Sequence, residues 1–258
     1  MNPVKVKNIE IGNGIPKICI PDIGKTKEEI LALAAEYKQL PMDILEWRAD
    51  WFEGVRDTAQ VLDVLSGLRT LLPDTPLLFT FRTKKEGGAS ELSDQDYLSL
   101  NIAAAQSGLA DLIDVEIFTG DGLVKSMIES IHKSGAKVVA SNHDFDKTPA
   151  ISDIIYRLRK MQDFGADILK IAVMPKSPKD VLNLLSATEE MRSCYTDKPL
   201  ITMSMAGNGS ISRIAGEFFG SAVTFGAGQA ASAPGQLDAF TLSEILKELH
   251  SSLHPEEL

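Results

Sequence analysis

Asp167-Ile-Leu-Lys-Ile-Ala-Val173 is the stretch of sequence that decides the fold. It is a short, nearly continuous apolar run of the kind found in parallel strands that are covered on both faces. In the middle of the run stands Lys170, a cation among side chains that prefer to be buried. The stretch therefore predicts a buried β-strand that carries one unusual charge.

A lysine in such a strand has a small number of possible roles. An isolated buried charge is costly, so a buried lysine is paired, becomes neutral, or opens into a cavity. A neutral lysine is a nucleophile that forms a Schiff base with a ketone or an aldehyde. The alternative is a lysine at a strand end whose stem is buried while its head reaches solvent. The segment alone leaves both interpretations of Lys170 open.

Strands of this kind recur along the chain, and a helical segment follows each one. The predicted strands are 18–20, 43–48, 77–82, 112–116, 137–143, 168–173, 199–204 and 222–225, and the predicted helices are 25–39, 59–71, 94–107, 122–134, 150–164, 178–195, 211–219 and 241–253. This alternation predicts an α/β fold, a (β/α)8 TIM barrel. A doubly wound open sheet is the alternative. The strand count and the absence of G-x-G-x-x-G after the first strand disfavour it.

Two short segments that alternate apolar and charged residues precede the repeated units. Residues 4–6 and 9–11 predict a β-hairpin that caps the barrel floor. We find no linker, charge block or low-complexity segment that divides the chain. We therefore expect residues 1–258 to form a single barrel domain.

Composition and charge exclude several classes of protein. The chain has 258 residues, is 44% hydrophobic and has a formal net charge of -10, which disfavours binding to nucleic acid or to an anionic membrane. No apolar run approaches the roughly 20 residues that span a bilayer, and the N-terminus has no signal-peptide core. Cys19 and Cys194 have no metal-ligand spacing. We interpret them as free thiols in a reducing cytoplasm.

Polar residues stand at or just beyond the predicted strand ends, where barrels place their chemistry. They are Glu46, Arg48, Arg82, Glu86, Glu116, Asn142, His143 and Asp144, and the sixth strand carries Lys170. Several cations at one rim of an acidic protein indicate a site for an anionic carbonyl compound. His143 suits proton transfer near neutral pH, although it could equally be a loop histidine held by Asp144. His250 and His254, four residues apart, form a possible metal pair, but the sequence supplies no third ligand, so we expect no metal site.

Two later loops complete the predicted rim. Arg213, near a predicted helix start, can bind a carboxylate or a phosphate. Residues 226–236 form a long Gly/Ala/Ser stretch that predicts a lid over the substrate, or else a plain flexible connection. Glycine loops after strands seven and eight are also where barrels bind phosphate.

Taken together, these residues resemble type I 3-dehydroquinate dehydratase. The resemblance rests on Glu46-Trp-Arg48, Phe79-Thr-Phe-Arg82, Glu86-Gly-Gly88, Ser141-Asn-His-Asp-Phe145, Lys170-Ile-Ala172, Ile211-Ser-Arg213 and Ser232-Ala-Pro-Gly-Gln236, and it runs through nearly the whole chain. It implies a homodimeric (β/α)8 barrel without metal or organic cofactor. The implied reaction removes water from 3-dehydroquinate to give 3-dehydroshikimate, on the shikimate route to chorismate and aromatic amino acids.

The resemblance also implies a role for each site residue. Lys170 would form the Schiff base, His143 would act as the general base and acid, and Glu86 would orient His143. Arg213 would bind the substrate carboxylate. The substrate-binding group would be completed by Glu46, Arg48 and Arg82 on the ring hydroxyls and by Ser232 and Gln236 from the lid. Pro21 departs from the pattern, because some members have a serine there and proline offers no hydroxyl.

Two other functions fit parts of the pattern. A class I aldolase acting on a sugar phosphate shares the strand lysine and would use the glycine loops, but His143 with Glu86 favours proton abstraction from a cyclic carboxylate. A catalytically silent barrel that serves as a binding protein is disfavoured by the intact Lys170 and His143 and by the charge gathered on one rim.

Overall fold

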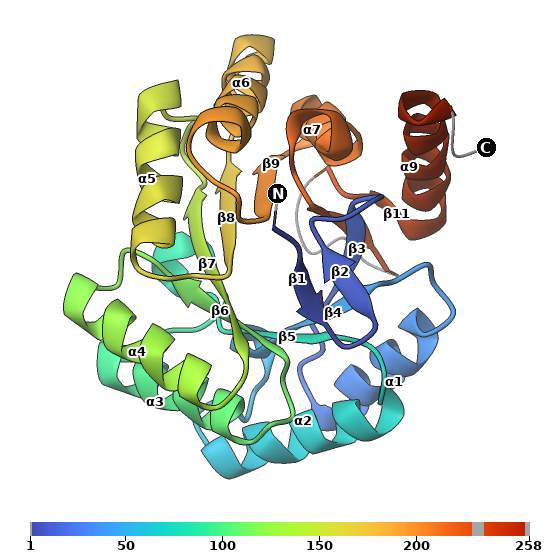
Figure 1. Ribbon diagram of the computed structural model, residues 1–258. Coiled ribbons are helices and arrows are strands. Elements are labelled where there is room, and N and C mark those ends of the chain that lie inside the picture. Colours follow the sequence, from blue (N-terminus) through green and yellow to red (C-terminus); the bar gives the residue numbers. More distant parts are fainter. Residues whose placement is uncertain (1, 229–234, 256–258) are drawn as a thin grey trace.

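The structure is a closed barrel of parallel strands inside a ring of helices (Figure 1). The computed structural model describes residues 2–228 and 235–255. The barrel strands are β3 (Lys17–Asp22), β4 (Ile44–Arg48), β5 (Leu77–Thr80), β6 (Leu112–Glu116), β7 (Lys137–Asp144), β8 (Ile168–Val173), β9 (Leu200–Ser204) and β10 (Val223–Ala227). The predicted (β/α)8 fold is confirmed.

The barrel closes between its last two strands and its first. Strand β10 pairs in parallel with β3, and the other strands follow in chain order to β9. Beside β9, the N–H of Ala222 donates to the carbonyl of Leu200 at 2.7 Å, and the N–H of Thr202 donates to Ser221 Oγ at 3.0 Å. Hydrogen bonds therefore join β9 to the segment that leads into β10.

The helices cover the outside of the barrel (Figure 1). They are α1 (Lys27–Tyr37), α2 (Thr58–Leu71), α3 (Asp94–Gln106), α4 (Asp121–Lys133), α5 (Ile151–Asp163), α6 (Pro178–Cys194), α7 (Ser210–Ile214), α8 (Gly216–Phe219) and α9 (Ala239–Leu253). Side chains that accept backbone N–H groups start several of them, for example Thr26 at α1 and Asp57 at α2. No helix in the described ranges is long and apolar enough to cross a membrane.

Two details depart from the expectation. The single helix expected over 211–219 is divided into α7 and α8, and Ala215 between them has φ -88° and ψ 14°, outside the helical region. A short strand, β11 (Leu237–Asp238), pairs in parallel with β10 just before α9. Two residues carry too little periodicity to be predicted as a strand.

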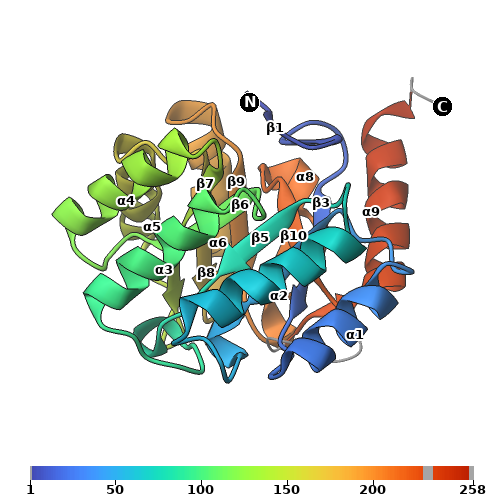
Figure 2. The ribbon, with the colours of Figure 1, turned by 90° about the horizontal axis from the view of Figure 1, so that it is seen from below.

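An N-terminal hairpin fills the barrel floor, as predicted. Strands β1 (Val4–Val6) and β2 (Ile9–Ile11) pair antiparallel, and Figure 2 shows this hairpin at one end of the barrel. Val6 and Ile11 are buried in a cluster with inward side chains from the first part of the barrel strands, among them Ile44 and Val139. The candidate catalytic residues therefore lie at the opposite end of the barrel.

We predict that Ile11→Ala lowers the free energy of unfolding by about 2–5 kcal/mol, because it removes a fully buried side chain from the floor. Chemical denaturation measures the change. Ile9→Ala, at a half-buried position on the same strand, is the matched control and should cost less. A change of less than about 0.5 kcal/mol for Ile11→Ala would place the hairpin outside the cooperative core.

Candidate active site

Side chains from several barrel strands line a cavity of about 110 Å³ at the carboxyl ends of those strands. Residues two apart on a strand point to the same face, which brings Glu46 and Arg48 together into the interior. The lining residues are Glu46, Arg48, Trp51, Arg82, Gly87, His143, Phe145, Lys170, Ala172, Met203, Met205, Arg213, Phe225 and Gln236. Most of the residues singled out from the sequence therefore meet at one cavity.

Lys170 lies deep in this cavity with its ammonium held by two carboxylates. Its side chain is 4% exposed, and Nζ lies 3.1 Å from Glu46 Oε1 and 3.3 Å from Asp114 Oδ2. The ring of Phe225 also lies under the ammonium, with Nζ 4.7 Å from the ring centroid. The lysine is thus a buried, paired cation facing a cavity, and the alternative of a side chain that reaches bulk solvent is excluded.

Arg82 links the carboxylates beneath the cavity. Its guanidinium donates to Asp114 Oδ2 at 2.8 Å, to Glu116 Oε1 at 2.9 Å and to Ser141 Oγ at 3.0 Å. Ser141 in turn donates to Asp114 Oδ1 at 2.6 Å. Burial raises the pKa of Asp114, but the charges of Arg82 and Lys170 outweigh it and hold that pKa below the usual value. Asp114 is therefore an anion shared by two buried cations.

His143 is held by Glu86 rather than by Asp144. Its Nδ1 lies 2.9 Å from Glu86 Oε2, and its backbone N–H donates to the same oxygen at 2.9 Å. Asn142 Nδ2 donates to Glu86 Oε1 at 3.0 Å. Asp144 instead pairs with Arg157. These contacts fix the imidazole so that its Nε2 edge is left for the cavity, which His143 lines.

A left-handed glycine lets the loop after β5 bring Glu86 to this position. Glu86 ends a short 3-10 helix, η2 (Lys84–Glu86), and Gly87 follows with φ +83°. A Cβ at Gly87 would lie 2.4 Å from the ring of Phe145, which stacks on His143 at 6.5 Å between ring centroids. Only glycine avoids both the backbone strain and this overlap.

The site holds His143 in its neutral form. Burial lowers the pKa of His143 well below 6.5, and the positive charges of Arg82, Lys170 and Arg48 lower it further. Burial, with the charge of Glu116, raises the pKa of Glu86 to about 8. The charge of Arg82 and the hydrogen bond from Asn142 favour the carboxylate and oppose this shift. An imidazole that is neutral at pH 7 can accept a proton.

Glu46 and Arg48 share a face, as the sequence pattern predicted, but their hydrogen-bonded partners differ. Arg48 makes a bidentate pair with Asp50, with both contacts at 2.8 Å, whereas Glu46 pairs with Lys170 and accepts from Thr80. Asp50 also accepts the backbone N–H of Ala89. It therefore ties the loop after β5 to Arg48.

The remaining predicted residues lie at different places. Arg213, on α7, is 1% exposed and lines the cavity, and burial lowers its pKa to about 10, so it is charged at pH 7. Gln236 also lines the cavity. Ser232 lies outside the described residues. Pro21 is buried beside Glu46 in the strand register, but it is not among the described residues that line the cavity.

Two carboxylates of the site were missed from the sequence. Asp114 stands two positions before Glu116 in Leu112-Ile-Asp-Val-Glu116, so period-two alternation could have placed it on the inner face. Asp50 follows a strand end and had no signal beyond its two-residue spacing from Arg48. Both are fully buried, a property that a single sequence does not display for a carboxylate.

Comparisons with known proteins agree with this geometry. A family model described as Type I 3-dehydroquinase matches residues 18–252. The chain is 54% identical over 250 residues to a 3-dehydroquinate dehydratase of Bacillus licheniformis, covering 97% of this chain and 98% of the relative. A type I 3-dehydroquinate dehydratase structure from Clostridium difficile superposes with a TM-score of 0.95 at 52% identity, covering 97% and 98% of the two chains.

A further solved structure is also similar to this chain. The 3-dehydroquinate dehydratase structure of Geobacillus kaustophilus gives a TM-score of 0.93 at 42% identity and covers 96% of each chain. The chain therefore belongs to the type I 3-dehydroquinase family, hydro-lyases of the Schiff-base class that dehydrate 3-dehydroquinate in the shikimate pathway of aromatic amino-acid biosynthesis.

Proposed function

We propose that Lys170 is the Schiff-base residue of this dehydratase and that His143 carries the proton. The observation that supports the proposal is that both side chains line one cavity from neighbouring strands. In the β7–β8 register Ser141 lies opposite Lys170 and His143 lies opposite Ala172, so the base stands one inward position beyond the amine. A base in that position can reach the carbon next to an imine carbon.

The proposed reaction follows from this placement. Nζ of Lys170 first gives a proton to His143 and then attacks the ketone carbon of 3-dehydroquinate. The carbinolamine oxygen takes one proton from the nitrogen and one from His143 and leaves as water, giving a protonated imine. His143 removes a proton from the adjacent carbon, and the electron pair of that C–H bond moves toward the imine nitrogen. The enamine then expels the hydroxyl one carbon further on, which takes the proton back from His143 and leaves as water. Hydrolysis of the imine releases 3-dehydroshikimate and Lys170.

The charges around Lys170 support these steps. A protonated imine keeps the positive charge that Glu46 and Asp114 already stabilise in the free enzyme. The cationic intermediate therefore enters an environment that needs little reorganisation. Glu86 would orient the His143 ring, and the imidazolium that forms would favour the carboxylate form of Glu86. The Clostridium difficile structure is described as holding covalently modified comenic acid, which supports covalent chemistry at this type of site.

Substrate binding is assigned to the remaining polar groups. Arg213 would bind the carboxylate, since it is a buried cation at the cavity wall. Glu46, Arg48 and Arg82 would hold ring hydroxyls, and Ser232 and Gln236 would close over the substrate from residues 226–236. Arg82 has a second task, because its side chain donates hydrogen bonds to Asp114, Glu116 and Ser141 and so holds the carboxylates under the site.

The proposal extends to the form in which the enzyme works. From the resemblance we propose a cytoplasmic homodimer that needs no metal or organic cofactor for this reaction. A dimer in sedimentation velocity, together with full turnover in the presence of a strong chelator, would support the proposal. A monomer with undiminished activity, or loss of activity on chelation, would contradict it.

Trapping the imine tests the role of Lys170. Incubation with 3-dehydroquinate and reduction with borohydride should add one reduced substrate residue to the peptide that contains Lys170, as located by mass spectrometry. Lys170→Ala should give neither adduct nor turnover, since no other amine replaces Nζ. Lys179→Ala, at an exposed position on α6, is the control and should behave as wild type. An adduct on another lysine would remove Lys170 from the role.

Proton transfer is tested at His143. His143→Ala should still form the borohydride adduct, with kcat lower by about 10²–10⁴-fold, as expected for loss of a general base. The lowered pKa of His143 predicts that kcat/KM stays high above pH 6.5 and falls only as the pH drops through that lowered value, because the base must be neutral. An acidic limb centred above pH 7, or a wild-type rate in the variant, would contradict the assignment.

The carboxylate contact is tested at Arg213. Arg213→Gln should raise KM by roughly 10- to 150-fold, because a hydrogen bond between charged groups contributes about 1.5–3 kcal/mol. Steady-state kinetics measure the change, and the adduct at Lys170 should still form at high substrate concentration. Arg159→Gln, an exposed arginine on α5, is the control. An unchanged KM would mean that another group binds the carboxylate.

A further inference from the structure

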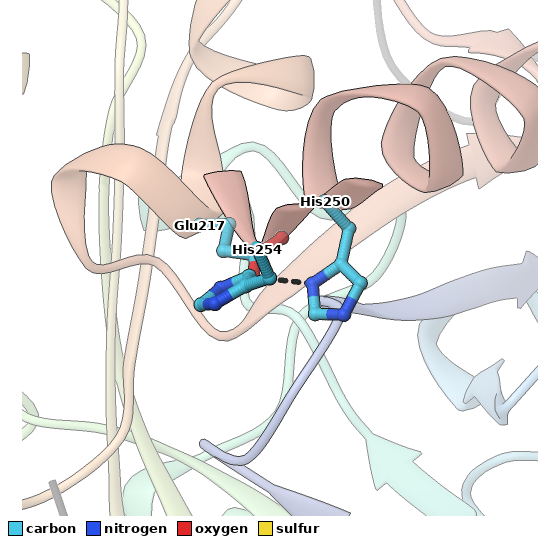
Figure 3. A group of neighbouring side chains, drawn as sticks. All are labelled: Glu217, His250 and His254. Carbon is cyan, nitrogen blue, oxygen red and sulfur yellow. Dashed lines mark hydrogen bonds and ion pairs between the residues drawn. The ribbon is translucent and has the colours of Figure 1, made fainter. Parts of the chain in front are cut away.

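A second group of polar side chains lies far from the active site, at the floor of the barrel. His250 is on the last turn of α9, His254 caps the C-terminus of that helix, and Glu217 is on α8, which lies beside the end of α9 (Figure 3). The last turn of α9 lies at the same end of the barrel as the N-terminal hairpin (Figure 2). The catalytic cavity opens at the other end.

The three side chains point toward one another. Nδ1 of His250 lies 2.6 Å from Glu217 Oε1, and Nε2 of His254 lies 3.2 Å from the same oxygen. One potential ligand atom from each residue lies within 4.8 Å of the other two. Bonds of about 2.0–2.2 Å from one zinc ion place its ligand atoms about 3–3.5 Å apart, so shifts of less than about 1.5 Å would bring these atoms around one ion.

The other carboxylate oxygen adds an independent observation. Glu217 Oε2 is buried and has no hydrogen-bond partner among the described residues. A buried acceptor that is left without a donor is costly, and a bound cation removes that cost. The carboxylate can therefore bind an ion through either oxygen while it remains between the two histidines.

Space for a further ligand lies next to the group. A cavity of about 500 Å³ borders all three residues and is also lined by Gly12–Gly14, Pro16, Arg192 and Ser221. Three protein ligands leave the fourth position of a tetrahedral ion open, and a water or an anion can fill it from this cavity. Arg192 also lines this cavity, and its positive charge would favour an anion as that fourth ligand.

From these contacts we propose that Glu217, His250 and His254 form a binding site for Zn²⁺. Two imidazoles and a carboxylate suit a borderline ion such as zinc, whereas Mg²⁺ and Ca²⁺ prefer oxygen ligands throughout. Each neutral imidazole would bind through the nitrogen that now faces Glu217, and its proton would reside on the other ring nitrogen. The His-x-x-x-His spacing was visible in the sequence, but the third ligand comes from 33 residues upstream of His250 and only the fold brings it near.

The proposed zinc site would hold the end of the C-terminal helix, α9, against α8. Helix α9 packs on β3 and β10, and its last turn is joined to α8 through these three side chains. A zinc ion bound by residues from both segments would stabilise the contact between α9 and α8, since an ion that binds the folded state alone raises stability. The function is distinct from the dehydratase reaction and does not depend on it.

Zinc titration of the untagged full-length enzyme tests the proposal. After treatment with a chelator, isothermal titration calorimetry with zinc chloride should give one bound ion per chain. Thermal denaturation should give a higher midpoint with zinc than without it. Loss of outer contacts alone weakens metal sites by about 10–100-fold, so Glu217→Gln and His250→Gln, which remove a ligand, should each lower the affinity at least tenfold. Both variants should keep wild-type turnover, which also shows that they fold.

His132→Gln is the matched control, because His132 is a histidine beside a carboxylate, Asp167, elsewhere on the surface. It should bind zinc as wild type does. The proposal would be overturned if wild type shows no saturable site, or if the Glu217 and His250 variants bind as tightly as wild type. Zinc that binds only with loss of turnover would also overturn it, because the ion would then lie at His143 and Glu86. Destabilised variants with an unchanged zinc affinity would leave the three residues as a hydrogen-bonded anchor alone.

Discussion

The ammonium of Lys170 and the carboxylates of Glu46 and Asp114 form the interaction on which the interior of the barrel depends. All three side chains are nearly inaccessible to water, so each charge must be stabilised by the others. Removing one member of such a group leaves a buried charge unpaired, at a cost of about 3–5 kcal/mol. The three side chains therefore keep fixed positions relative to one another, and these positions set the shape of the cavity above them.

Arg82 connects this group of charges to further residues on β6 and β7. Through Asp114 and Glu116 it joins β5 to β6, and through Ser141 it reaches β7. The backbone N–H and hydroxyl of Thr83 both donate to Glu116, which fixes the start of the loop that carries Glu86. The position of His143 is thus set indirectly by the same charges that hold Lys170. One network positions both proposed reacting groups.

Much of this fold could be predicted from the sequence because each barrel strand is a short apolar run with a helix after it. The sequence pattern also brought Glu46, Arg48 and Lys170 together, and all three line the cavity. The divided helix α7–α8 and the two-residue β11 could not be predicted, since both depend on contacts between distant segments. The hydrogen-bond partners of the charged side chains could not be predicted either. Nothing in the local sequence shows that Arg48 binds Asp50 rather than Glu46, or that Glu217 approaches His250.

Closure of the barrel has a consequence for how the chain assembles. Strands β3 and β10 are neighbours although about 200 residues separate them, whereas β7 and β8 pair across a single intervening helix. Contacts between distant segments form more slowly than local ones, because more chain entropy is lost. During synthesis the β7–β8 pair that bears His143 and Lys170 can therefore form while the later strands are still absent. Until β10 is made, the inner faces of the early strands stay exposed, and the chain is most open to aggregation in that interval.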